Sequence, residues 1–175
     1  MAEPSDRLDD TDGAFVSFGQ KLLSSESFRT LFREGMSLVE ETAGYLDGEG
    51  REESRALART TALAYATESM RLTTRLMQIA SWLLIQRAAN EGEMNPEQAL
   101  AEKQKVKLST GRSTVPVETF AALPERLRDL VARTERLQER VIMLDNQIKE
   151  PAVDNHDNPI GNQLALLRTA FASNG

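Results

Sequence analysis

The chain has 175 residues, a net charge of −6 and no cysteine. Its length suits one domain with tails, and the absence of thiols excludes disulfides and cysteine-ligated zinc. The negative charge argues against a broad phosphate-binding surface. Residues 1–12 are polar and acidic, which predicts a disordered N-terminus and no secretory signal peptide. The longest uncharged apolar run, 76–86, is about half as long as a membrane span requires.

Two amphipathic segments precede the centre of the chain. Helical spacing of apolar residues predicts a short helix over 14–23 and a longer one over 26–46. Gly35 and Gly44 lie inside the longer helix, where each costs roughly 1 kcal/mol relative to alanine. Close approach of a neighbouring helix would explain them, and a local kink is the alternative. The two glycines in 47–50 then predict a tight turn between antiparallel helices.

The segment 51–91 contains no proline, and glycine occurs only at its borders, at positions 50 and 92. It therefore predicts one long helix. Its apolar residues form two seams whose centres lie roughly 100° apart on the helix. Because a surface helix normally buries one stripe, the second seam needs another helix or a second copy of the chain. The seams centre on Leu63, Met70, Met77 and Leu84 on one side, and on Leu72, Leu76, Ile79 and Leu83 on the other.

The C-terminal half contains two further helix signals. Residues 95–98 combine a capping Asn, a Pro in the first turn and a Gln three residues after the cap, which predicts a short helix over 96–104. Residues 105–117 show no lasting period and predict a mobile loop. Apolar residues then alternate in steps of four and three over 124–149, as in coiled coils and helical bundles, until Pro151 closes the helix.

These elements predict an all-α fold, an antiparallel three-helix bundle over residues 13–149 with short accessory helices. The middle helix would span about 60 Å, and its two neighbours about 30 and 40 Å. Part of its apolar length would then be uncovered in a monomer, so we expect a homodimer. Residues 150–175 predict a flexible tail that contains a short helix over 161–172.

Motifs for catalysis or cofactor binding are absent from the sequence. No phosphate-binding glycine loop occurs, and His156, the single histidine, lies in an Asn- and Asp-rich linker that predicts no fixed ligands. We therefore expect no enzyme, no metal and no cofactor. Two other classes remain as alternatives. One is a nucleic-acid-associated helical dimer that uses the basic residues Lys103, Lys105, Lys107 and Arg112, which have no interleaved aromatic residue, and the other is a structural coiled-coil scaffold.

Two segments are candidate partner-binding sites. On a helical wheel Trp82 falls beside Arg71, Arg75 and Gln78, opposite the seams, and an exposed Trp between arginines is typical of interaction hot spots. Alternatively, the 96–104 helix or Phe120 covers Trp82. The second candidate is the tail, which could dock on its own bundle or fold on a partner. Its apolar residues at helical spacing are Leu164, Leu167 and Phe171.

Several blocks of the sequence resemble the family of the regulator of CtrA degradation, RcdA. They read FRTLFREGM at 28–36, VEETAGYLDG at 39–48, LAYATESMRLT at 63–73 and SWLL at 81–84. The final helix is compatible, so the resemblance covers roughly residues 26–148.

This resemblance implies a cytoplasmic, homodimeric three-helix protein with a flexible C-terminal tail, and recruitment to a cell pole is a further expectation from it. It implies an adaptor role in regulated proteolysis during the cell cycle. The protein would help the ClpXP protease, together with a response regulator of the CpdR type, to receive substrates such as CtrA. No family motif assigns individual contact residues to this sequence.

Overall fold

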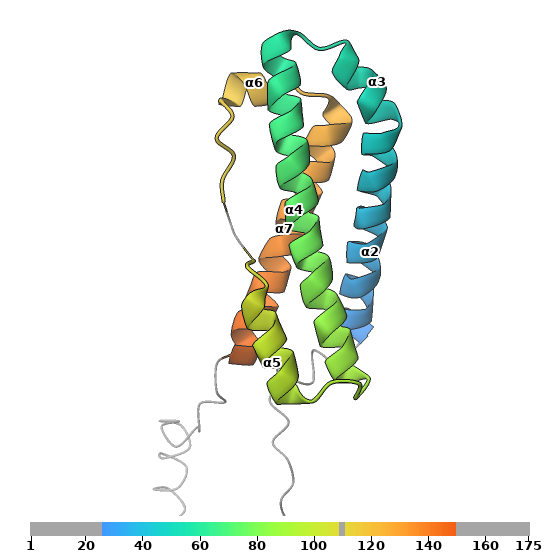
Figure 1. Ribbon diagram of the computed structural model, residues 1–175, viewed down its shortest axis with the longest axis vertical. Helices are drawn as coiled ribbons and strands as arrows, with labels where there is room; N and C mark the ends of the chain where they lie inside the picture. The colour runs from blue at the N-terminus through green and yellow to red at the C-terminus, as the bar shows by residue number, and fades with distance from the viewer. Residues whose placement is uncertain (1–25, 109–110, 150–175) are drawn as a thin grey trace, which may run out of the picture.

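The computed structural model describes residues 26–108 and 111–149, and every regular element in this part of the chain is a helix. The all-α class predicted from the sequence is therefore confirmed for these residues. The predicted segments at 1–12, 14–23 and 150–175 lie outside them. The helices are α2 (Glu26–Asp47), α3 (Glu49–Arg55), α4 (Arg59–Asn90), α5 (Pro96–Lys105), α6 (Val117–Ala121) and α7 (Glu125–Lys149) (Figure 1).

The three longest helices, α2, α4 and α7, pack against one another. In Figure 1, α2 rises through the molecule, whereas α4 and α7 both descend. The expectation that successive long helices are antiparallel is therefore wrong for α4 and α7, which run parallel. The reason is the connection between them. It begins with α5 at the lower end of α4 and returns to α6 at the upper end before α7 starts (Figure 1).

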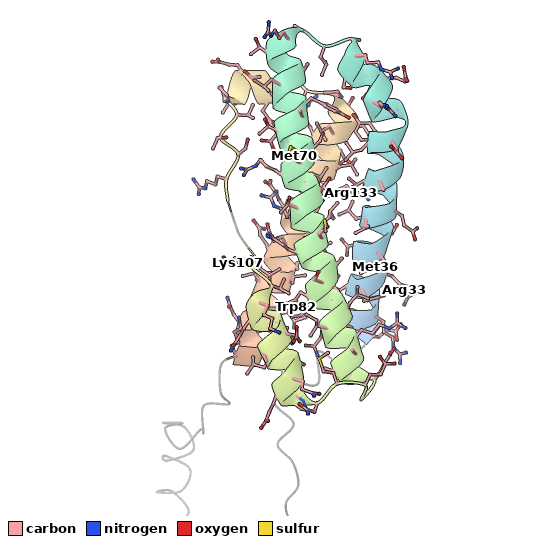
Figure 2. All side chains as sticks on the ribbon, in the orientation of Figure 1. Arg33, Met36, Met70, Trp82, Lys107 and Arg133 are labelled. Carbon is pink, nitrogen blue, oxygen red and sulfur yellow. The ribbon has the colours of Figure 1, made fainter. Side chains whose placement is uncertain are left out.

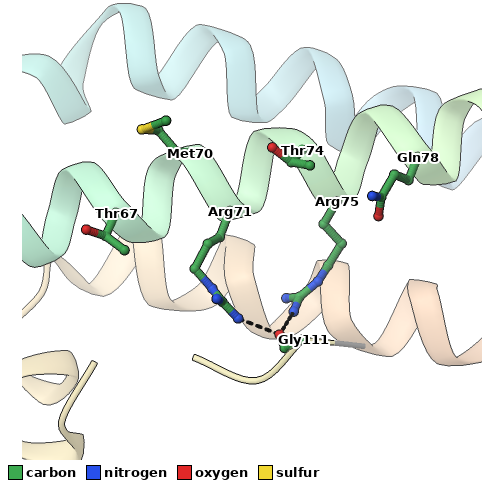
Figure 3. A pocket seen from close by; sticks show the side chains of 7 residues that line it. All are labelled: Thr67, Met70, Arg71, Thr74, Arg75, Gln78 and Gly111. Carbon is green, nitrogen blue, oxygen red and sulfur yellow. Dashed lines mark hydrogen bonds between the residues drawn. The ribbon is translucent and has the colours of Figure 1, made fainter. Parts of the chain in front are cut away.

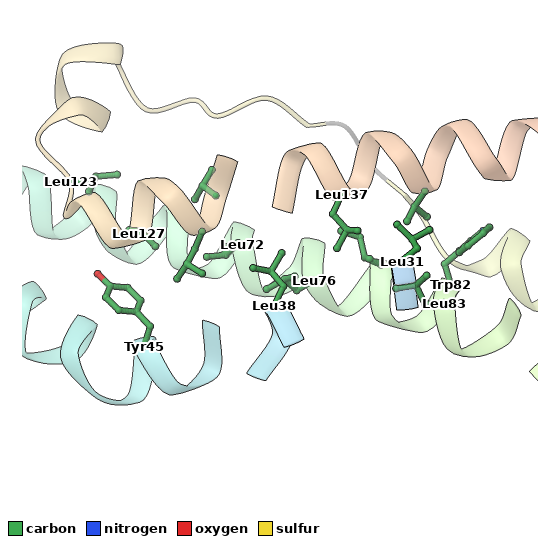
Figure 4. Packing of buried hydrophobic residues seen from close by; sticks show 14 of the residues in the cluster. Leu31, Leu38, Tyr45, Leu72, Leu76, Trp82, Leu83, Leu123, Leu127 and Leu137 are labelled. Atoms are coloured by element: carbon green, nitrogen blue, oxygen red, sulfur yellow. The ribbon is translucent and has the colours of Figure 1, made fainter. Parts of the chain in front are cut away.

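The core lies between these three helices. From α4 it receives the seam of Leu72, Leu76, Ile79 and Leu83, none of them more than 4% exposed. Leu38 of α2 and Leu137 of α7 face this seam (Figure 4). A Cβ atom on Gly35 would lie 2.5 Å from Cδ1 of Leu83, so this glycine lets α2 and α4 approach closely. Gly44 has no such neighbour within 4 Å, and close approach does not explain it.

The long helix predicted over 51–91 is interrupted, and the chain reverses at Ala56–Ala58 instead of at 47–50. Figure 1 shows α3 continuing from the upper end of α2 before the chain crosses to α4. Gly50 in α3 is buried, and a Cβ there would lie 2.6 Å from the Tyr65 hydroxyl. The close contact of α3 with the tyrosines therefore keeps residues 49–55 on the side of α2, and α4 starts only at Arg59.

Of the short helices α5 and α6, the sequence predicted the first but not the second. α5 has the predicted capping box between Asn95 and Gln98. α6 lies where the sequence predicted a loop and the approach to the last helix, and none of its residues is buried.

None of the helices among the described residues is long and apolar enough to span a bilayer.

Candidate interaction surfaces

One seam of α4 is covered by no other part of the described chain. Its four large apolar side chains are half to three-quarters exposed and recur every seven residues, so they form one stripe along the helix. Small residues, Ala66, Thr73 and Ala80, lie three positions after the first three of them. We call this surface the α4 stripe. Its members and their exposed fractions are Leu63 (70%), Met70 (72%), Met77 (66%) and Leu84 (51%).

The two predicted seams of α4 therefore differ in burial. The seam around Leu76 is the core contact of α4 with its own chain, whereas the α4 stripe faces outward. Contiguous apolar surface of this kind marks a contact surface in soluble proteins. Small residues between the large ones also permit another helix to approach closely.

A hollow with a volume of about 390 Å³ borders this stripe (Figure 3). Met70 belongs to both surfaces, so the apolar stripe and the polar hollow are continuous. Arg71 and Gln78 are half-buried in the hollow, whereas Arg75 is only 9% exposed. The lining residues are Thr67, Met70, Arg71, Thr74, Arg75, Gln78 and Gly111.

The two arginines of the hollow hold the returning chain against α4. Both donate hydrogen bonds to the carbonyl oxygen of Gly111 (Figure 3), and the bond from Nη2 of Arg75 is 3.2 Å long. Nη1 of Arg75 also lies 3.0 Å from Oε1 of Glu135 on α7. The guanidinium groups are thus engaged within the chain, and the hollow has no surplus of unpaired positive charge.

The loop is fixed at a second point two residues further along. The hydroxyl of Ser113 donates to the carboxylate of Glu68, which is only 3% exposed. The guanidinium Nε of Arg71 lies 3.7 Å from the same carboxylate. Residues 111–113 are therefore anchored along α4 at the edge of the hollow.

Trp82 is fully buried, and the hypothesis that it forms an exposed docking face with Arg71 and Arg75 is wrong for this conformation. Its indole N–H donates to Oδ1 of Asp145 on α7 at 2.8 Å. It lies where α4 meets α5 (Figure 2), and the Nζ atom of Lys103 on α5 is 5.0 Å from the centroid of its ring. Of the two alternatives left open by the sequence, the structure shows the covered side chain.

Lys103 is itself buried, with 6% of its surface exposed. Its ammonium group donates to the side-chain oxygen of Gln86, another buried residue of α4. Burial lowers the pKa of Lys103, while Asp145 acts to raise it and Lys149 to lower it. Because Lys103 lies inside the molecule, the surface basic patch proposed around 103–112 lacks one of its four members.

The group around Trp82 includes residues that sequence reasoning missed. Asp145 is 63 positions away from Trp82 and carries no motif, and nothing in the sequence links Gln86 to Lys103. One signal was present: the strong cap before α5 predicted a helix at 96–104, and that helix covers Trp82.

The tail residues Leu164, Leu167 and Phe171 lie outside the described residues, as does His156. Within residues 26–108 and 111–149, no three His, Asp or Glu side chains gather in a metal-binding group.

Comparison with known proteins gives two findings. A family model described as "Protein of unknown function (DUF1465)" matches residues 19–171. The chain is also similar to the crystal structure of RcdA from Caulobacter crescentus CB15, with 54% sequence identity and a TM-score of 0.61. That match covers 73% of this chain and 95% of the other. None of the curated proteins matches the sequence.

Proposed function

Because the chain belongs to the RcdA family, we propose that it is a non-enzymatic adaptor that helps to deliver cell-cycle regulators such as CtrA to the ClpXP protease. The observation that carries this proposal is the 54% identity over 95% of the RcdA structure. The family, anticipated from the sequence blocks, is confirmed by this match and by the family model over 19–171. The adaptor would act in the cytoplasm with a CpdR-like response regulator, and recruitment to a cell pole is part of the same proposal.

An adaptor needs docking surfaces on a rigid frame and requires no acid, base or cofactor. Contacts with micromolar dissociation constants, worth about 8 kcal/mol, suffice for this work. Tethering then raises the local concentration of a cargo protein to roughly millimolar. The rigid helices and the exposed α4 stripe suit this requirement.

Reconstituted proteolysis tests the proposal. ClpXP, the CpdR-like regulator of the host and purified CtrA are combined with and without this protein, and the half-life of CtrA is followed on gels. We expect degradation to accelerate only when the protein is present, and to require ATP and ClpX. An unchanged half-life under all conditions would reject CtrA delivery.

We further propose that a second copy of the chain covers the α4 stripe. Its large apolar side chains and its heptad spacing are what a helix–helix contact between two copies requires. The same repeat makes the stripe self-complementary: in an antiparallel pair, Leu63 would lie opposite the partner copy's Leu84, and Met70 opposite its Met77.

Charge on the stripe tests this pairing. The double variant Met70→Glu, Met77→Glu places four carboxylates in the proposed interface, so we expect a monomer by light scattering where the wild type is a dimer. Val117→Glu is the control, because Val117 is 85% exposed on α6 and does not belong to the stripe. A dimer that persists in the double variant would show that another surface makes the contact.

The hollow beside the stripe is a proposed docking surface for partner proteins, with Arg71, Arg75 and Gln78 in its lining. Thr74→Trp would fill the hollow without removing an ion pair, and we expect it to weaken capture of the CpdR-like partner. Thr60→Trp, at an exposed position of the same helix, is the matched control. Light scattering on both variants separates loss of the partner from loss of the dimer.

The tail is the second proposed docking element, through Leu164, Leu167 and Phe171. A chain ending at Pro151 should keep its melting temperature and lose CtrA delivery if the tail binds partners. Loss of stability instead would show that the tail packs on its own helices.

A further inference from the structure

α5 covers the single tryptophan of the chain. Trp82 has no exposed surface, and the Nζ atom of Lys103 lies 5.0 Å from the centroid of its ring. Figure 4 shows the Trp82 side chain reaching toward α5 at the end of the row of core leucines. This part of the core is therefore closed by a short accessory helix, whereas the rest is closed by α2 and α7.

α5 itself contributes few buried side chains, and Val106 and Leu108, which follow it, are partly buried against the core. Of its ten residues, only Ala99 and Lys103 are buried. The methyl group of an alanine contributes less than about 1 kcal/mol on burial. Burial of the lysine ammonium group opposes docking, because removal of a charge from water must be offset by its new partners. Helices that bury few side chains belong to the parts of proteins that open locally, below the free energy of global unfolding.

The surface under α5 belongs to α4 and α7, which pack against each other without it. Trp82 forms its floor, and the carboxylate of Asp145 and the side-chain oxygen of Gln86 supply two acceptors. Asp145 is also held by Nζ of Lys149 at 2.6 Å. An aromatic floor with fixed polar groups at its edge is the composition of an interaction hot spot. We call this surface the Trp82 groove.

We propose that α5 is a displaceable cover and that the Trp82 groove is a docking site for a partner helix that presents a small residue followed, four positions later, by a lysine. This is the pair that α5 itself presents through Ala99 and Lys103. The proposal rests on the adaptor function and names one of its docking surfaces. Two chemical features select the occupant. A small side chain fits the buried position of Ala99, and a lysine ammonium group donates to the side-chain oxygen of Gln86 and lies over the ring of Trp82, as that of Lys103 does.

The solvent exposure of Trp82 reports on the cover directly. Ala99→Asp places a carboxylate in the contact between α5 and α4, and Ala101→Asp makes the same change at an exposed position of α5. We expect acrylamide quenching of Trp82 in the Ala99→Asp variant to approach that of the urea-unfolded chain, with a red shift of the emission. The Ala101→Asp variant should keep the wild-type quenching. Unchanged shielding in both variants would reject α5 as the cover.

A peptide of residues 94–107 labelled with a fluorophore is the probe for the groove. Circular dichroism first establishes that the Ala99→Asp chain keeps its helices and melts cooperatively. We expect the peptide to bind this variant and to bind the wild type more than tenfold more weakly, because the tethered α5 competes at an effective concentration of roughly millimolar. The peptide with Lys103→Glu should not bind either chain. If the unmodified peptide fails to bind a folded Ala99→Asp chain, the groove is not a docking site.

Hydrogen exchange on the wild type keeps the proposal falsifiable if the Ala99→Asp chain does not fold. Amides of α5 should exchange much faster than those of α4 and α7, through local opening. Exchange of α5 only at the rate of global unfolding would overturn the proposal. These outcomes do not depend on CtrA delivery, so a failed proteolysis assay and a closed groove are distinguishable.

Discussion

The two sides of α4 differ in what they bury: one exposes large apolar side chains, whereas the other buries polar side chains beside its leucine seam. On one side, Met70 and Met77 are about two-thirds exposed. On the other, Glu68, Arg75 and Gln86 are at most 9% exposed. The polar side is buried because α7, α5 and the loop at 111–113 supply partners for its charges. The apolar side has none within the described chain. Among the described residues, burial thus follows the partners available to each face.

Truncation of neighbouring side chains on α4 gives the largest expected contrast. Leu72 is 1% exposed and Met70 is 72% exposed. Leu72→Ala leaves a cavity in the core and should lower the free energy of unfolding by about 2–5 kcal/mol. Met70→Ala should change the free energy of unfolding of a monomer by no more than about 0.5 kcal/mol.

Urea unfolding, followed by circular dichroism at several protein concentrations, measures both effects. If a second copy covers Met70, the loss in Met70→Ala should grow as the concentration rises into the dimer range. A large loss that does not depend on concentration would instead place Met70 in the core of the single chain.

The two glycines of α2 also compare a position packed against the core, Gly35, with one that has no close neighbour, Gly44. Gly35→Ala brings its Cβ to 2.5 Å from Leu83, a fully buried side chain, and should destabilise the protein by roughly 1–3 kcal/mol. Gly44→Ala meets no atom within 4 Å and should stabilise it by about 0.5–1 kcal/mol. Opposite signs in thermal melts would confirm that α2 and α4 touch at Gly35. Equal effects of the same sign would contradict this packing.

The hydrogen bond between Trp82 and Asp145 tests the contribution of the buried polar residues to stability. Asp145→Ala removes the acceptor of the Trp82 indole N–H and the ion-pair partner of Lys149, and the unpaired buried donor alone costs about 1–3 kcal/mol. Asp145→Asn keeps an acceptor oxygen and should lose less. A double-mutant cycle with Trp82→Phe, measured by urea unfolding, isolates the bond. Additive losses would show that Trp82 and Asp145 do not interact.

Much of the helix content was predictable because its signals are local. The cap at Asn95 and the heptad spacing that ends at Lys149 are written within a few residues of the elements that they define. The two seams of α4 were also visible as periodicity. Sequence alone could not assign which seam faces the chain, because that depends on where the other helices lie.

The features that escaped prediction all depend on contacts between distant residues. The sequence leaves open whether Trp82 is exposed beside the charges of Arg71 and Arg75 or covered by another segment. Those charges are matched by Gly111, Glu68 and Glu135, which helical periodicity cannot identify. The break at Ala56–Ala58 contains no glycine or proline, and the parallel course of α7 follows from a connection that lacks a regular pattern.

The smallest expected effect concerns the ion pair between Glu41 of α2 and Arg133 of α7. Glu41 accepts two hydrogen bonds from Arg133, at 2.8 and 2.7 Å, and Nη2 of Arg126 lies 2.9 Å from its Oε1. The hydrogen bonds from Arg133 lower the pKa of Glu41 below 4.5; burial opposes this shift, and the charges of Arg133 and Arg126 add to it. Because Glu41 is then more acidic in the folded state, its contribution to stability is complete above pH 4.5 and is lost as the pH falls through the lowered value.

Glu41→Gln should therefore lower the free energy of unfolding by up to about 1 kcal/mol at pH 7, since the pair is partly exposed and screened by solvent. The difference from the wild type should disappear in acid, where the wild-type carboxylate is protonated as well. Glu40→Gln, at an exposed neighbouring position, is the control and should track the wild type at both pH values. A loss in Glu41→Gln that persists unchanged in acid would mean that the glutamine disturbs packing, and that the ion pair contributes nothing to holding α2 against α7.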